Sequence, residues 1–233
     1  MNPATRIAIC IFVLTIGQMG ADPSRAADEK FSQAEQQLFL ADHLHDLGKS
    51  AVLQYDFKKT GTLEKNFQDT VLLTVKPDTG TGRAVEVAYL NGERKVTLPA
   101  MEDAKGNPVI LYFLERDVRE MHARLGGSEN YFRRRIRLAF AEGAEVRPVI
   151  VSFEGKNIVA SEVLIHPFQN DPMKEKLRKF ENKTYAFTLS DRVPGGVYRL
   201  RSWVAELGEK SGANREENAL PLDESLTFQR VRK

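Results

Sequence analysis

Few residues of this chain have the types and the spacing that catalysis or metal binding requires. His43 and His45 stand two residues apart beside Asp42, and on a helix this spacing turns the two imidazoles to different faces. They therefore cannot share one metal ion, and His45 is expected to point with the apolar stripe of its helix as a buried histidine. A metal site would have to bring His45 and Asp42 to a distant histidine, His122 or His166. No His-Glu-x-x-His, Gly-x-Ser-x-Gly or His-x-Glu motif occurs, so we expect no metal and no other cofactor.

The densest group of charges, between positions 115 and 137, is the candidate binding surface. Two pairs of opposite charges stand four residues apart and compensate each other on one helix: Glu115–Arg119 and Glu120–Arg124. Three arginines of the next helix are expected on the side away from its apolar stripe: Arg133, Arg134 and Arg137. A solvated face is the simpler interpretation. The functional alternative is a surface that contacts anionic head groups or an acidic partner.

The N-terminus has the pattern of a secretory signal peptide. One positive charge, Arg6, precedes an apolar run over 7–16, which is too short for the roughly 20 residues that a membrane-spanning helix needs. Small residues predict cleavage after Ala26, with cleavage after Ala21 as the alternative. We therefore expect residues 1–26 to be a signal peptide and the protein to be periplasmic, without a transmembrane anchor.

The composition of the mature chain, 27–233, excludes several classes of function. Cys10, the only cysteine, lies in the predicted signal peptide, so disulfides and thiol catalysis are excluded after cleavage. A formal net charge of +2 is too small to indicate nucleic acid, and an exported protein rarely meets it, so we expect no nucleic-acid partner.

Hydrophobic periodicity predicts a single α+β domain. Helical spacing of apolar residues indicates a helix over 28–47 with a capping box at its start, and a pair of helices over 107–143 that is interrupted at Gly126-Gly127. Alternation predicts strands that are joined as hairpins, with Asn91-Gly92 as the strongest hairpin signal. The expected strands cover 51–57, 71–75, 85–89, 95–98, 149–153, 158–165, 185–189 and 197–204, with an edge strand over 226–231. Hairpins favour an antiparallel, curved sheet that packs on the N-terminal helix and the helix pair.

The segments at 31–47, 53–57 and 71–77 carry a family resemblance. An export signal, a leading amphipathic helix, a strand meander and inserted helices follow one another in an order that resembles the lipoprotein-carrier (LolA-like) half-barrel fold of Gram-negative periplasms. The early basic-aromatic strand of that family has no counterpart here, so the resemblance transfers no functional residue.

These observations predict a soluble periplasmic binding or carrier-type protein for an apolar or lipid-like ligand, acting without catalysis. The alternative is an interaction module that docks on a cell-envelope complex through the face of Arg133, Arg134 and Arg137. An enzyme whose acid and base residues are scattered along the sequence is a third hypothesis, because a single sequence does not reveal such a site.

Overall fold

The computed structural model describes residues 31–48, 50–63, 65–77, 83–98, 101–205 and 220–232. The predicted signal peptide and residues 78–82 and 206–219 lie outside the described residues. From Phe31 onward the chain forms one compact unit.

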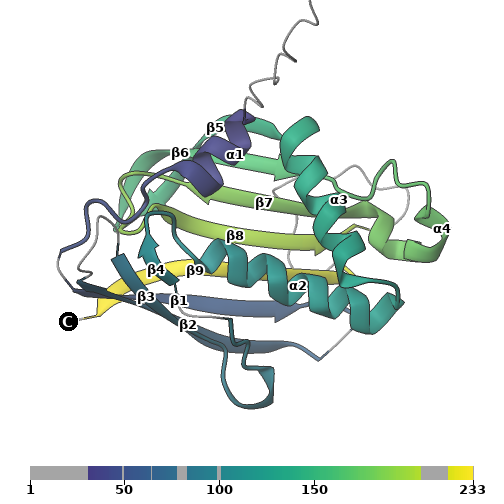
Figure 1. Cartoon of the computed structure of the whole chain (residues 1–233), viewed down its shortest axis with the longest axis horizontal. Coiled ribbons are helices and arrows are strands. Elements are labelled where there is room, and N and C mark those ends of the chain that lie inside the picture. The colour runs from purple at the N-terminus through teal and green to yellow at the C-terminus, as the bar shows by residue number, and fades with distance from the viewer. Residues whose placement is uncertain are drawn as a thin grey trace, which may run out of the picture. The chain divides into compact units, whose positions relative to one another are not determined.

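In the part of the chain that the structure describes, nine antiparallel strands form one open, curved sheet, which confirms the predicted α+β class (Figure 1). Across the sheet their order is β4-β3-β2-β1-β9-β8-β7-β6-β5. The strands are β1 (Ala51–Thr60), β2 (Phe67–Pro77), β3 (Arg83–Tyr89), β4 (Met101–Ala104), β5 (Glu145–Phe153), β6 (Lys156–Ile165), β7 (Lys183–Leu189), β8 (Val197–Val204) and β9 (Leu222–Arg232). The chain therefore builds two meanders, β1 to β4 and β5 to β8, and β9 joins them.

The last strand is not the edge strand that the sequence predicts. β9 lies at the centre of the sheet and pairs with β1 on one side and with β8 on the other. Its first half, Leu222–Leu226, is buried although three of these five residues are polar. Two of these polar residues, Asp223 and Glu224, pair with cations inside the molecule.

The Asn91-Gly92 hairpin is also different from the prediction. Asn91 is extended, with φ −122°, and donates its backbone and side-chain N–H groups to Asp69 instead of entering the left-handed turn that a two-residue hairpin requires. A 3₁₀ turn (Gly92–Arg94) follows, and the predicted strand at 95–98 contributes only one bridge, Val96 to Tyr89. On the side away from β2, β3 pairs with β4 instead.

The capping box of the N-terminal helix is confirmed, but the helix begins at Gln33, later than the predicted position 28, and it ends early. Ser32 and Glu35 form the capping box, in which Ser32 N–H donates to Glu35 (2.9 Å) and Glu35 N–H donates to Ser32 (3.1 Å). The helix consists of α1 (Gln33–Glu35) and a π-helical turn (Gln36–Leu40). It stops because the Asp42 carboxylate accepts from Leu44 N–H and so competes with the helical hydrogen bonds. The helical prediction for 41–47 is wrong, and His45 is exposed rather than buried.

The central helix pair is confirmed. α2 (Val109–Leu125) and α3 (Glu129–Glu142) lie across one face of the sheet, which we call the inner face (Figure 1). Ser128 caps α3 by accepting from Asn130 N–H, and the Asn107 side chain accepts from Val109 N–H at the start of α2. Between β6 and β7 the chain forms α4 (Lys174–Leu177) and a 3₁₀ segment (Arg178–Asn182).

Candidate functional site

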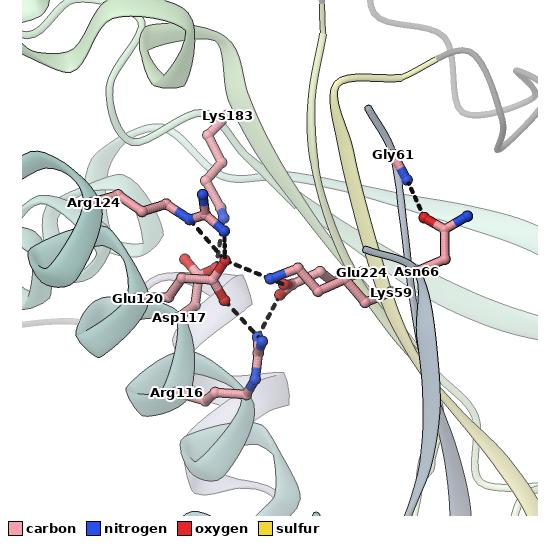
Figure 2. Close-up of polar contacts among 9 residues, drawn as sticks. All are labelled: Lys59, Gly61, Asn66, Arg116, Asp117, Glu120, Arg124, Lys183 and Glu224. Carbon is pink, nitrogen blue, oxygen red and sulfur yellow. Dashed lines mark hydrogen bonds and ion pairs between the residues drawn. The ribbon is translucent and has the colours of Figure 1, made fainter. Parts of the chain in front are cut away.

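α2 directs a charged side toward the sheet, although a helix that lies on a sheet usually directs apolar residues inward. Arg116, Asp117, Glu120 and Arg124 all reach the interface between α2 and the inner face (Figure 2). Polar residues of four neighbouring strands lie opposite this side of α2. The strand register places them next to one another: Lys59 of β1, Glu224 of β9, Ser202 of β8 and Tyr185 of β7.

These groups form a network that we call the buried charge cluster: Lys59, Arg116, Asp117, Glu120, Arg124, Lys183 and Glu224. Arg116 donates to Glu224 (2.6 Å) and to Glu120 (2.8 Å). Lys59 lies 2.6 Å from Glu120 and 2.9 Å from Glu224. Each carboxylate therefore has at least one cationic partner within hydrogen-bonding distance.

Asp117 is the second centre of the cluster. Its side chain is almost completely buried, and it accepts from the Lys183 ammonium and from the Tyr185 hydroxyl. Burial and the neighbouring Asp117 charge both raise the pKa of Tyr185, so this hydroxyl keeps its proton and remains a donor.

The pKa values of the Glu224 and Glu120 carboxyl groups are shifted in opposite directions. Burial would raise the pKa of Glu224, but Arg116, Lys59 and Lys183 outweigh burial and hold it below its ordinary value. Burial raises the pKa of Glu120, and the nearby Glu224 charge raises it further, against the effect of Arg116 and Lys59. Glu224 is therefore the fixed anion of the cluster.

The buried charge cluster joins α2 to the centre of the sheet. Its cations and carboxylates pair with one another, and none of its seven residues lines the groove between α2 and α3 that is described below. We assign the cluster to the architecture, because buried pairs of this kind fix a packing arrangement more reliably than they add stability.

A groove of about 560 Å³ lies between α2 and α3, and it is the candidate ligand site. The two helices diverge from their short connection (Figure 1), and Glu35 and Phe39 of the N-terminal helix, with Leu98 and Met101, also line the groove. Eight apolar side chains line this helix groove: Phe39, Leu98, Met101, Leu111, Leu114, Val118, Ile136 and Phe140. Its volume is in the range of sites that bind small molecules, about 300–1,000 Å³.

Helical spacing explains why the helix groove is apolar. α2 contributes positions 111, 114, 115 and 118, and α3 contributes positions 133, 136, 137 and 140, which in each helix form one stripe. Leu114 and Ile136 are buried, whereas Leu111 (42%) and Phe39 (36%) keep large exposed fractions. The groove thus has a closed floor and an apolar mouth that water reaches.

The rim of the helix groove carries four charged residues: Glu35, Glu115, Arg133 and Arg137. Arg133 and Glu115 join the two helices by two hydrogen bonds, of 2.9 and 2.7 Å, and Arg133 also contacts Glu129 at 2.6 Å. The hydrogen bonds from Arg133 lower the pKa of Glu115, partly against its desolvation.

The three arginines that the sequence singles out fall in different places. Arg133 and Arg137 flank the apolar stripe of α3 and line the helix groove, so their predicted position away from that stripe is wrong. Arg134 is exposed and does not line the groove. The pairs Glu115–Arg119 and Glu120–Arg124 are confirmed, at 3.1 and 2.9 Å.

The histidines do not converge. Within the described part of the chain, no group of three histidine, cysteine, aspartate or glutamate side chains could hold a metal ion. His43 hydrogen-bonds to Gln37 O and Asn107 N–H, and His122 to Gly127 O. Among the described helices, none is long and apolar enough to cross a membrane.

Comparison with known proteins adds no family to this description. No protein-family model matches the chain, and no curated protein is found to be similar to it in sequence.

Proposed function

We propose that this protein is a periplasmic binding or carrier-type protein, and that its helix groove holds an apolar or lipid-like ligand without catalysing a reaction. The observation that carries the proposal is the lining of the groove: eight apolar side chains form its walls, and the charged residues stand at its rim. Concave apolar sites with a few polar groups are the usual form of small-molecule sites.

An acyl chain is the occupant that fits this chemistry. The groove offers a continuous apolar surface along two helix stripes and an open mouth, so it can accept a long, flexible chain at one end. Each buried methylene contributes about 0.8 kcal/mol. Affinity should therefore rise by up to about fourfold per added methylene until the groove is full.

Calorimetric titration with octanol, decanol and dodecanol tests the proposal with neutral ligands, using protein purified from cells that express the full coding sequence. Leu111→Ser should weaken dodecanol binding, because Leu111 lines the mouth. Leu63→Ser is the matched control: this leucine is exposed to a similar extent, 38% against 42%, and does not line the groove. Absence of binding, or equal losses in both variants, would contradict the proposal.

Export through a cleaved signal peptide belongs to the same proposal, as does kinship with the LolA-like carriers. Its support is the charge, apolar length and small residues of positions 1–26. The intact mass of protein from a periplasmic fraction should correspond to a chain that begins at Ala27, or at Asp22 for the alternative site. A partner crosslinked in cells and lost on reversing Arg134 and Arg137 would instead favour the docking alternative.

A further inference from the structure

One charge at the rim of the helix groove has no partner among the residues that the structure describes. Glu35 accepts from Ser32 N–H in its capping box, and Glu115 and Arg133 bind each other. Arg137, the fourth rim residue, forms no ion pair or hydrogen bond with the part of the chain that the structure describes. Its guanidinium can therefore bind a ligand without first giving up a contact.

The position of Arg137 relates this free charge to the apolar walls. Arg137 directly follows Ile136 and precedes Phe140 by three residues, slightly less than one helical turn, and all three side chains line the groove. A ligand that lies along Ile136 and Phe140 would lie beside Arg137, whose side chain is exposed. Arginine offers parallel N–H donors that match the two oxygens of a carboxylate or phosphate.

From this arrangement we infer that the ligand is an anionic single-chain amphiphile, with its chain in the helix groove and its carboxylate or phosphate on Arg137. The inference rests on the proposed function and adds the class of the head group. Glu35 stands at the same rim and disfavours an anion there, so the guanidinium and not the net charge of the rim must supply the selectivity.

Head-group selectivity at constant chain length tests the inference. Dodecanoate and dodecyl phosphate should bind more tightly than dodecanol, and dodecyltrimethylammonium more weakly. A charge-assisted hydrogen bond corresponds to about tenfold in affinity. Acetate and inorganic phosphate, which share the head groups but lack the chain, should not compete at the concentrations that dodecanoate needs.

Arg137→Gln should lower the affinity for dodecanoate by about tenfold and leave dodecanol within about twofold of the unchanged protein. Arg134→Gln is the matched control, since this arginine lies on the same helix, is exposed and does not line the groove. Glu35→Gln keeps the capping box, because glutamine also serves in it, and should bind dodecanoate at least as tightly.

The outcomes separate this inference from the proposed function. If dodecanol and dodecanoate bind alike and Arg137→Gln behaves as Arg134→Gln does, the inference is overturned and the carrier function stands. Equal losses for acid and alcohol in Arg137→Gln would mean that Arg137 contributes only its methylene stem, which also overturns it. If neither ligand binds the unchanged protein, the proposed function itself fails.

Discussion

Arg116 of α2 donates a 2.6 Å hydrogen bond to Glu224 of β9, whose carboxylate is completely buried. A helix on the inner face and the central strand of the sheet are thus connected by an ion pair within the core. Removing one partner of such a pair leaves the other charge buried and uncompensated.

Glu224→Gln should therefore lower the free energy of unfolding by about 3–5 kcal/mol. The variant leaves Arg116 and Lys59 with one carboxylate, Glu120, instead of two. Glu86→Gln is the matched control, because Glu86 pairs with Lys76 on the exposed surface at 2.7 Å and should change the value by less than about 0.5 kcal/mol. Urea titration measures the free energy of unfolding of both variants. Equal decreases in Glu224→Gln and Glu86→Gln would contradict the role given to Glu224.

The pair of Asp117 and Lys183 should behave as one unit in a double-mutant cycle. Asp117→Leu and Lys183→Met should each destabilise the protein by about 3–5 kcal/mol, because each leaves a buried charge without its partner. The double variant removes both charges, so its loss should be smaller than the sum of the single losses by on the order of 1–3 kcal/mol. Strict additivity would show that the two residues act independently.

Gly195, in the turn between β7 and β8, should not tolerate a side chain. Its φ is +77°, and an added Cβ would lie 2.5 Å from Leu53 Cδ1 and 3.0 Å from Asn107 Nδ2. Gly127 has a similar φ of +81°, but nothing lies within 4 Å of the corresponding position. Both alanine variants incur backbone strain of about 1–2 kcal/mol. Gly195→Ala should lower the free energy of unfolding by about 1–3 kcal/mol more than Gly127→Ala, because the neighbours of Gly195 must move. Thermal or urea unfolding measures the difference.

Acidification should destabilise the protein through His43. Its Nδ1 accepts from Asn107 N–H at 3.0 Å and its Nε2 lies 2.8 Å from Gln37 O, so the ring is neutral in the fold. Burial lowers the pKa of His43, against the opposing effects of Gln37 O, Asp191 and Asp42. The unfolded chain, with a pKa of about 6.5, binds the proton first. Stability should stay constant above about pH 6.5 and fall as the pH decreases toward the folded pKa.

Unfolding curves of the His43→Gln variant provide the check. Glutamine can accept from Asn107 and donate to Gln37, so the variant should fold and show a smaller loss between pH 7 and pH 5. Burial also lowers the pKa of His166. The free energy of unfolding of the His43→Gln variant should therefore still decrease with falling pH, but less steeply. His45→Gln, at an exposed position, should keep a slope at least as steep as that of the unchanged protein. An unaltered slope in His43→Gln would refute the assignment.

The fold was predictable from sequence where burial follows a simple period. The alternating residues of β1 to β3 and the stripes of α2 and α3 face one layer of core each, so hydrophobic patterning locates them. Central placement of β9 was not predictable, because Asp223 and Glu224 are polar in sequence and are buried in pairs with Arg201, Lys59 and Arg116 from other elements. Compensation of this kind arises from pairing across the fold and leaves no local signal.

The candidate site was predictable only in part. Spacing marked the arginines of α3, but the groove exists because α2 and α3 diverge, which depends on how each helix sits on the sheet. Arg133 was expected on the side of its helix away from the apolar stripe, and it binds Glu115 of the other helix. The distinction between Arg133 and Arg137 therefore required the structure.

The central position of β9 has a consequence for folding and for fragments of this protein. β1 and β8 do not pair with each other, so the sheet becomes continuous only when the segment at 222–232 enters between them. Closing that gap joins regions far apart in sequence, which slows folding relative to the local hairpins. A chain truncated before Leu222 would present β1 and β8 as open edges, which are templates for aggregation. A synthetic peptide of residues 220–233 should suppress that aggregation by strand addition, as the missing strand does within the intact molecule.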